Sequence, residues 1–197
     1  MSIWDKNEYC SETFESEDLS GVEISSKQFE ACKFIGCNFS EATFNRCSFV
    51  ECEFTKCNLS VVNIEYSKFS DVVFRGSKVI GIDWAKGVWP RLLFNSPIKF
   101  YDSILNDSSF HGLSLPDLVL QSCIAHRVDF RDADFTSSNF TGTDFSSSMF
   151  EKTTLSKVDF TNATDFDIDI FSNNLKKAKF DRFEAIRLLG CLDIELV

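Results

Sequence analysis

The chain has 197 residues, of which 44% are hydrophobic and 25% charged, enough for one domain and too few for two large ones. Its 30 acidic and 20 basic residues give a formal charge of −10, which repels nucleic-acid phosphate and argues against direct nucleic-acid binding. The 22 Phe beside only 3 Trp and 3 Tyr indicate that the architecture selects one aromatic shape repeatedly.

Residues 1–20 carry neither the basic stretch nor the apolar core of a secretory signal peptide. Nowhere do about 18 apolar residues follow one another, so no membrane-spanning helix is predicted. We therefore expect a soluble, cytoplasmic protein whose eight Cys are reduced thiols. Residues 1–11 precede the regular pattern and are expected to form an N-terminal segment or cap.

The rest of the sequence repeats every five residues, a period that fits neither an α-helix nor a β-strand. We call the large apolar residue of each repeat the central position. The phase shifts by one residue near Lys99, which predicts a register break near residues 95–99 with one extra residue within residues 95–97. The first run of central positions is Phe14, Leu19, Ile24, Phe29, Phe34, Phe39, Phe44, Phe49, Phe54, Leu59, Ile64, Phe69, Phe74, Val79, Trp84, Trp89 and Phe94. The second run is Phe100, Leu105, Phe110, Leu115, Leu120, Ala125, Phe130, Phe135, Phe140, Phe145, Phe150, Leu155, Phe160, Asp165, Ile170, Leu175 and Phe180.

These central positions hold 19 of the 22 Phe, so we expect them to build the core. Two residues before each of them, at what we call the small position, the chain places Cys, Ala, Ser, Thr or Val. The backbone must turn regularly to bring both positions inward every five residues, which leaves the polar remainder for the surface. The predicted core is represented by Phe34, Phe39, Phe44, Phe49, Phe54, Phe130, Phe135, Phe140, Phe145 and Phe150.

The pattern resembles the pentapeptide-repeat family, as in Ala133-Asp134-Phe135-Thr136-Ser137. The resemblance implies an all-β fold, a right-handed quadrilateral β-helix with four repeats per coil, over residues 12–180. Its 34 central positions correspond to about eight and a half coils. At a spacing of ~4.8 Å the rod is expected to be about 40 Å long, with each residue stacked on the one 20 positions later.

This stacking accounts for most of the cysteines without catalytic chemistry. Cys32 is expected next to Cys52 and Cys37 next to Cys57, each as a compact inward thiol. Disulfide formation is geometrically conceivable, but a reducing compartment favours free thiols. A line of thiols does not supply tetrahedral zinc ligands, and His111 and His126 are expected at the surface.

The repeat is disturbed at residues 80–103 and near Asp165. In the first region Trp84 and Trp89 occupy central positions, so one interpretation is a locally overpacked coil. The alternative is an exposed apolar patch for a partner. In the second region Phe166 falls where an outward residue is due, and the last coil is expected to loosen because Asp165 is not expected to be buried unpaired.

A short amphipathic α-helix is predicted after the repeats, because Asp181 and Glu184 have the spacing of a helix-capping box. It caps the open end of the β-helix, and residues 181–197 form the cap. Residues 178–197 also look like the C-terminal helix of Qnr-type members, which implies a two-fold homodimer, whereas a capping-only monomer is the alternative. The residues expected to form the dimer contact are Phe183, Ile186, Leu189, Leu192 and Ile194.

No catalytic, cofactor-binding or metal-binding motif is found, so we expect a non-enzyme that uses no cofactor. One hypothesis, implied by the Qnr, MfpA and McbG types, is an acidic DNA mimic that protects or modulates DNA gyrase or topoisomerase IV. The chain shows only one break in the count and not the two sizeable loops of Qnr-type members, and its acids form no tall ladder. The other hypothesis is a protein-interaction scaffold with an unidentified partner.

Acids cluster at residues 12–30 and 129–169. The candidate partner surface is Val88, Leu93, Asp129, Asp134, Asp144, Asp159 and Asp169.

Overall fold

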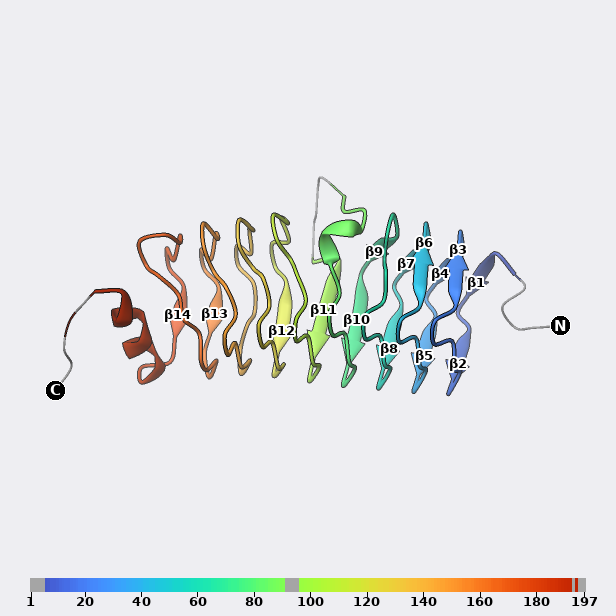
Figure 1. The fold of residues 1–197 in the computed structure, drawn as a ribbon, viewed down its shortest axis with the longest axis horizontal. Coiled ribbons are helices and arrows are strands. Elements are labelled where there is room, and N and C mark those ends of the chain that lie inside the picture. The colour runs from blue at the N-terminus through green and yellow to red at the C-terminus, as the bar shows by residue number, and fades with distance from the viewer. Residues whose placement is uncertain (1–5, 91–95, 193, 195–197) are drawn as a thin grey trace.

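The computed structural model describes residues 6–90, 96–192 and 194. The chain winds into a rod of successive coils, with its N-terminus at one end and a short helix at the other (Figure 1). All strand pairs are parallel, and in the first half each residue pairs with the one 20 positions later, as Phe14 does with Phe34. Four repeats therefore complete one coil, as the family resemblance implies.

The strands form ladders along the sides of the rod, and isolated bridges such as Asn38 with Asn58 continue the ladders between them. The first regular coil begins at β1, upstream of the expected boundary at residue 12, because Tyr9 pairs with Phe29. One sheet has the order β1-β4-β7-β9, with β1 Glu8–Cys10, β4 Gln28–Glu30, β7 Ser48–Val50 and β9 Lys68–Ser70. A second has the order β12-β11-β10-β8-β5-β2, with β2 Thr13–Glu15, β5 Lys33–Ile35, β8 Glu53–Thr55, β10 Val72–Arg75, β11 Ile98–Tyr101 and β12 Val119–Gln121. Two pairs complete the ladders, β3 Glu23–Ser25 with β6 Thr43–Asn45 and β13 Asp159–Phe160 with β14 Lys179–Phe180.

The strands are short because the chain turns a corner after almost every repeat. The residue two positions after the central one, which we call the corner position, adopts a left-handed backbone, with φ of 54° at Ser11, 55° at Ser16 and 66° at Gly21. Such a residue reverses the local curvature that a strand would keep. The five-residue period is thus one short side of the coil plus its corner.

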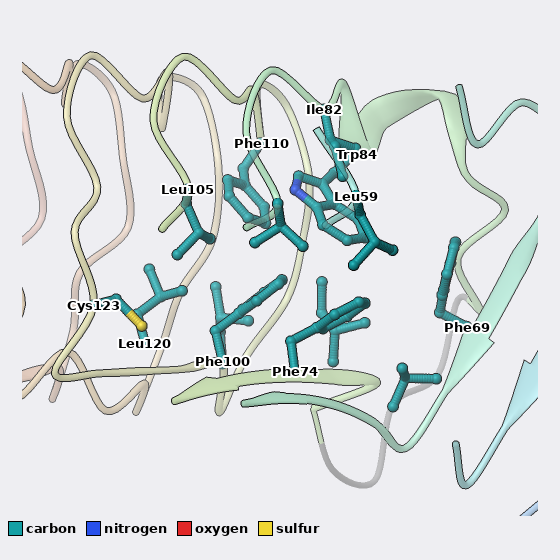
Figure 2. Close-up of a cluster of buried hydrophobic side chains, with 14 of the residues drawn as sticks. Leu59, Phe69, Phe74, Ile82, Trp84, Phe100, Leu105, Phe110, Leu120 and Cys123 are labelled. Carbon is teal, nitrogen blue, oxygen red and sulfur yellow. The ribbon is translucent and has the colours of Figure 1, made fainter. Parts of the chain in front are cut away.

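Aromatic rings stack along the interior. Phe34 lies between Phe14 and Phe54, with ring centroids 5.0 and 4.5 Å apart and interplanar angles of 11°. The structure buries all ten Phe that represent the predicted core, and the most exposed of them, Phe150, retains 5% of its surface. Figure 2 shows the same packing in the middle of the rod, where Trp84 lies among Phe74, Phe100 and Phe110.

The side chains at the small position satisfy backbone groups inside the rod. The Ser77 hydroxyl donates to the carbonyl oxygen of Phe54 at 3.0 Å and accepts from the backbone N–H of Cys57 at 3.0 Å. Cysteines at this position also donate to buried carbonyl groups: the Cys52 thiol donates to the carbonyl oxygen of Phe29 at 3.4 Å. Buried backbone groups must find partners, so the interior needs small polar side chains here.

The register break in the middle of the rod is larger than the expected single residue. Phe74 pairs with Phe100, an offset of 26 instead of 20, so six extra residues leave the coil. Trp84 correspondingly stacks on Phe110, with ring centroids 5.8 Å apart. The one-residue prediction was wrong because six residues change a five-residue phase by one. Phe94 and Leu93 lie outside the described residues.

The second disturbance is a local shift inward. Phe166 and Ile168 are buried, with 0% and 3% exposure, whereas Asp165 and Ile170 are only partly buried. Asp165 has a left-handed backbone with φ of 52°, so it takes a corner conformation and passes its expected inward position to Phe166. This exchange avoids the burial of an unpaired carboxylate.

The helix predicted after the repeats is η2, Glu184–Leu192, and it is a 3₁₀ helix rather than an α-helix. Asp181, expected to cap the helix, lies three residues before η2, and its Oδ1 accepts from the backbone N–H of Phe183 at 3.0 Å in the turn that leads into it. The Ile186 N–H then bonds to the carbonyl oxygen of Phe183, three residues earlier, at 3.4 Å. Leu188 packs against the core, so η2 covers the end of the rod.

Candidate interaction surfaces

The described residues contain no group of three or more His, Cys, Asp or Glu side chains that could hold a metal ion. In the same part of the chain no helix is long and apolar enough to cross a membrane. The cysteines are free thiols, and burial raises the pKa of Cys52 and Cys123 to about 12.

The acids of the candidate partner surface do not come together. Asp129, Asp134 and Asp144 belong to three different sides of the rod, and Asp159 belongs to the fourth. Their neighbours along the ladders are not acidic: Asp129, for example, pairs with Ser109 and Met149. The second half of the rod thus carries dispersed acids and no ladder of carboxylates among its described residues.

These acids have a structural role that the sequence analysis missed. Asp134 Oδ1 accepts from both the backbone N–H of Thr136, at 2.9 Å, and its hydroxyl, at 2.6 Å. Asn139 accepts from the backbone N–H of Thr141 in the same way without a charge. The signal is the spacing of Asp or Asn two residues before Ser or Thr, which favours such side-chain turns. The same contact is made by Asp144 with Ser146, by Asp159 with Thr161 and, through the backbone alone, by Asp169 with Phe171.

Several of the acids are also paired with cations. Arg131 donates to both oxygens of Asp129, at 2.9 and 2.8 Å, and these hydrogen bonds lower the pKa of the Asp129 carboxyl. Lys179 lies 3.0 Å from Asp159. His126 Nε2 lies 2.7 Å from Asp144, so this predicted surface histidine has a carboxylate partner. Paired carboxylates present less charge to a partner than their number implies.

The acidity is concentrated at the other end of the rod. Residues 6–30 contain seven acids and two bases, a net −5 out of the −10 of the whole chain. These acids surround the first coil and are exposed or only partly buried. They are Glu8, Glu12, Glu15, Glu17, Asp18, Glu23 and Glu30.

The region around Trp84 and Trp89 has features of both interpretations of the sequence, the packed coil and the exposed apolar patch. Trp84 is buried with 1% exposure, so its coil is packed. Val88 is 40% exposed, and the half-buried Trp89 stacks on Phe69 and donates from Nε1 to the carbonyl oxygen of Trp84 at 2.9 Å. With Pro90 these side chains border a hollow of about 380 Å³. An apolar surface exists here, next to the inserted residues.

Exposed apolar side chains also gather at the C-terminal end of the rod. Phe183 is 79% exposed, and Ile186 and Ile194 are 53% and 54% exposed. Leu189 and Leu192, the other expected dimer residues, are partly buried. Phe171, 74% exposed, was not predicted, although it lies one residue beyond the expected central position Ile170. We call Phe171, Phe183, Ile186 and Ile194 the end patch.

A parallel β-helix with four sides and a stacked aromatic interior is a solenoid, a class of repeat proteins in which each coil contacts only its neighbours along the rod. The family profile described as the pentapeptide repeat region matches residues 27–97 and 96–160. The chain therefore belongs to the pentapeptide-repeat family. No curated protein matches it.

One solved structure shows the same fold, and others are similar to the chain. A trypsin-treated variant of QnrB1, a plasmid-mediated fluoroquinolone resistance protein, is 23% identical with a TM-score of 0.56, and the match covers 96% of this chain and 90% of that chain. Full-length QnrB1 is 20% identical with a TM-score of 0.47, over 95% and 100% of the two chains. HetL, from the cyanobacterium Nostoc sp. strain PCC 7120, is 15% identical with a TM-score of 0.28, over 87% and 84%. At these identities the likeness concerns the fold alone.

Proposed function

We propose that the protein is a non-enzymatic, cytoplasmic binding protein whose β-helix is a scaffold for contacts with other proteins. The observation that carries this proposal is the use of the acids in the second half of the rod. Asp134, Asp144 and Asp159 accept hydrogen bonds within turns on three different sides, so they offer no continuous acidic stripe. Exposed apolar side chains gather instead beside Trp89 and at the end patch, and such patches mark protein contacts.

The first contact that we propose is a two-fold homodimer through the end patch. Phe183, directly before η2, and Ile186, within it, are exposed, while Leu188 packs the helix against the core. A second copy would remove these side chains from water, at about 25 cal/mol for each Å² of apolar surface buried. A self-complementary patch at one end joins two rods end to end.

This contact is tested with Phe183→Asp and Ile186→Asp, separately and together, in light scattering. The variants are expected to halve the mass of the particle without changing the far-ultraviolet circular dichroism. Met149→Asp, which introduces the same charge at an apolar side chain 42% exposed elsewhere on the rod, is the matched control and should leave the mass unchanged. A wild-type monomer, or a dimer that survives both substitutions at 300 mM NaCl, contradicts the proposal.

A second candidate function is mimicry of DNA toward a type II topoisomerase such as DNA gyrase, and the acidic first coil favours it. With a net −5 over residues 6–30, this coil attracts cationic protein surfaces of the kind that bind DNA. QnrB1, whose fold the chain shares, is a plasmid-mediated fluoroquinolone resistance protein. The two candidates place the contact at different parts of the rod, so they can be separated.

The discriminating experiment is a gyrase supercoiling assay, with competition between the protein and DNA as a second readout. Under the mimicry hypothesis the wild type inhibits supercoiling, and Glu15→Gln with Glu17→Gln and Glu23→Gln weakens the inhibition. Glu151→Gln with Asp132→Asn and Asp117→Asn, which removes three exposed acids from the second half, is the matched control. Absence of both inhibition and competition, at concentrations well above the dissociation constant of the dimer, leaves the scaffold as the function.

A further inference from the structure

The outer surface of the sheet β1-β4-β7-β9 differs from the other sides of the rod in its charge arrangement. We call it the first-sheet face. The outward side chains of its strands include Ser48, Val50, Ser70 and Val88, which are small or uncharged, with Lys68 between Ser48 and Val88 and Glu30 next to Val50. Three shallow hollows of about 470, 400 and 380 Å³ all include Ser48 in their lining, so they form one trough along the rod. At ~4.8 Å per strand, the trough spans about 19 Å over five coils.

One edge of this face, which we call the basic rim, is lined by Arg46, Lys68 and Lys86. Arg46 is a corner residue before β7, Lys68 begins β9, and Lys86 follows at the end of η1, Trp84–Lys86. The Arg46 guanidinium lies over the ring of Tyr66, 5.4 Å from its centroid, and the Tyr66 N–H bonds to the carbonyl oxygen of Lys86 at 3.1 Å. The three cations are exposed, and within the described residues none of them forms an ion pair.

The opposite edge, the acidic rim, is lined by Glu30, Glu51 and Asp71. Glu51 is the corner residue after β7 and Asp71 the corner residue after β9, with φ of 53° at each. Asp71 lies 2.6 Å from Lys99, while Glu30 and Glu51 form no ion pair with any residue that the structure describes. Arg46 and Glu51 therefore flank the same strand, β7, whereas Lys68 is the first residue of the next strand along the rod, β9, and Asp71 follows it.

This arrangement is complementary to itself under one particular symmetry. Consider a two-fold axis that runs parallel to the rod, between two copies that face each other. Rotation about it keeps equivalent residues at the same level along the rod and brings the basic rim of each copy opposite the acidic rim of the other. It therefore places Arg46 opposite Glu51 of the second copy, and Lys68 on the same side of the contact as Asp71 of the second copy. A two-fold axis across the rod would instead oppose like charges. Because the contact is isologous, each of these pairs occurs twice.

We propose that the first-sheet face is a second self-association surface, on which two copies of this chain lie side by side and parallel. This contact is distinct from the end patch and does not depend on the proposed function. Backbone pairing cannot create it, because the N–H and carbonyl groups within the ladder are already used between coils, as in the bond from Gln28 N–H to the carbonyl oxygen of Asn7. It relies on side chains, so it is weak, reversible and sensitive to salt.

The test is sedimentation equilibrium of the full chain at 50 and 300 mM NaCl. The side-by-side association constant is expected to fall about tenfold at the higher salt, as exposed charge pairs are screened. Association through the apolar end patch should not weaken. The Phe183→Asp and Ile186→Asp background removes that end contact, so a failure of the proposed homodimer and a failure of this face are distinguished.

Charge reversal gives the sharper test. Arg46→Glu and Glu51→Lys are each expected to reduce the association about tenfold, since each places like charges opposite one another at two sites. An equimolar mixture of the two variants restores opposite charges at both sites and should associate at least as tightly as the wild type. Both positions have left-handed backbones that Glu and Lys already occupy elsewhere, at Glu41 and Lys56, so folding is preserved and is checked by thermal melting.

Lys152→Glu is the matched control, because Lys152 is another exposed corner residue, without an ion pair among the described residues, on a distant coil. It should leave the association unchanged. The proposal is overturned if Arg46→Glu behaves like Lys152→Glu, if the mixture associates no better than either variant alone, or if the wild type shows no salt-dependent association.

Discussion

Arg187 on η2 and Asp165 in the last coil form an ion pair, with Nη2 and Oδ1 2.6 Å apart. Asp165 is the acid that interrupts the repeat, and its left-handed backbone turns its side chain away from the core that Phe166 fills. The interruption thus provides the charge that helps to hold the cap. Together with the packing of Leu188, this pair joins η2 to the rod.

We expect Asp165→Asn to lower the free energy of unfolding by less than about 1 kcal/mol, because the pair is partly exposed, at 35% for Arg187 and 49% for Asp165. Asp165→Ala should lower it by about 1 kcal/mol more, since Ala tolerates the left-handed backbone less well than Asn. Urea denaturation measures both. Asp102 is the control, because it is a corner residue without an ion pair among the described residues. Substitutions there should change stability only through the backbone conformation. If Asp102→Asn lowers the free energy of unfolding more than Asp165→Asn does, the ion pair does not stabilise the cap.

The hydroxyl of Ser77 can be tested as a bridge between coils. Ser77→Ala leaves the buried N–H of Cys57 without its partner and should reduce the free energy of unfolding by about 1–3 kcal/mol. Ser77→Cys should recover part of the loss, because Cys47, Cys52 and Cys57 already serve as donors at this position. Ser70→Ala, at an exposed site, is the control in the same denaturation experiment. Equal losses at the two sites would show that the bridge contributes nothing.

The periodicity of the sequence predicts the core because side-chain direction is repeated in every coil. Counting in fives, however, gives only the position of a residue within its repeat and not the number of residues inserted between two repeats. Six inserted residues before Phe100 therefore look like one, and the prediction of a single extra residue missed almost the whole insertion. Phe94 fits the count as a central position, but it falls in the stretch of sequence between Val88 and Ile98 over which the pairing offset changes from 20 to 26. Only the pairing partner, Phe74, reveals the true length.

Surface function was harder to predict than the core, for a physical reason. A carboxylate at the surface can serve the backbone, a neighbouring cation or a partner, and composition does not distinguish these uses. Asp134 and Asp144 were predicted as partner contacts, yet both accept hydrogen bonds from their own turns. The charges of the first-sheet face went unnoticed because Arg46 and Glu51 become the two rims of one side only when the corners are known.

A corner residue offers a route to greater stability. Val61 is 59% exposed and has a left-handed backbone with φ of 60°, which is unfavourable for a β-branched side chain. Val61→Asn should raise the free energy of unfolding by about 0.5–1 kcal/mol, because Asn tolerates this conformation, as Asn162 does at another corner. Thermal melting provides the measurement. Val22→Asn, at a similarly exposed residue whose backbone is not left-handed, should give no gain, and a gain there would attribute the effect to polarity.

The thiols should differ sharply in reactivity. Cys10 is exposed and Cys191 partly buried, whereas the six others are inward and buried. Burial raises the pKa of Cys52 and Cys123 to about 12, so few of these thiols ionise at pH 8. Alkylation with iodoacetamide at pH 8, followed by mass spectrometry, should modify Cys10 first and all eight thiols only in guanidinium. Cys10→Ser should abolish the fast phase, and rapid modification of Cys52 in the native protein would contradict the inward packing.

The pairing of Asp129 with Arg131 should make stability depend on pH in the acid range. The hydrogen bonds from Arg131 lower the pKa of the Asp129 carboxyl in the folded chain below its unfolded value of about 3.9. The charged form is therefore favoured by folding, so its contribution is fully present above about pH 5 and is lost as the pH falls through the folded pKa.

Asp129→Asn keeps an acceptor for the backbone N–H of Arg131 and removes the charge, so it should lower the free energy of unfolding by about 0.5–1 kcal/mol at pH 7. In urea denaturation, the difference in the free energy of unfolding between Asp129→Asn and the wild type should shrink toward pH 3. Asp134→Asn is the control, because Asp134 lies in a turn without a cation partner among the described residues, and its difference from the wild type should not shrink in this way. A constant difference for Asp129→Asn between pH 7 and pH 3 would show that the ion pair contributes no pH-dependent stability.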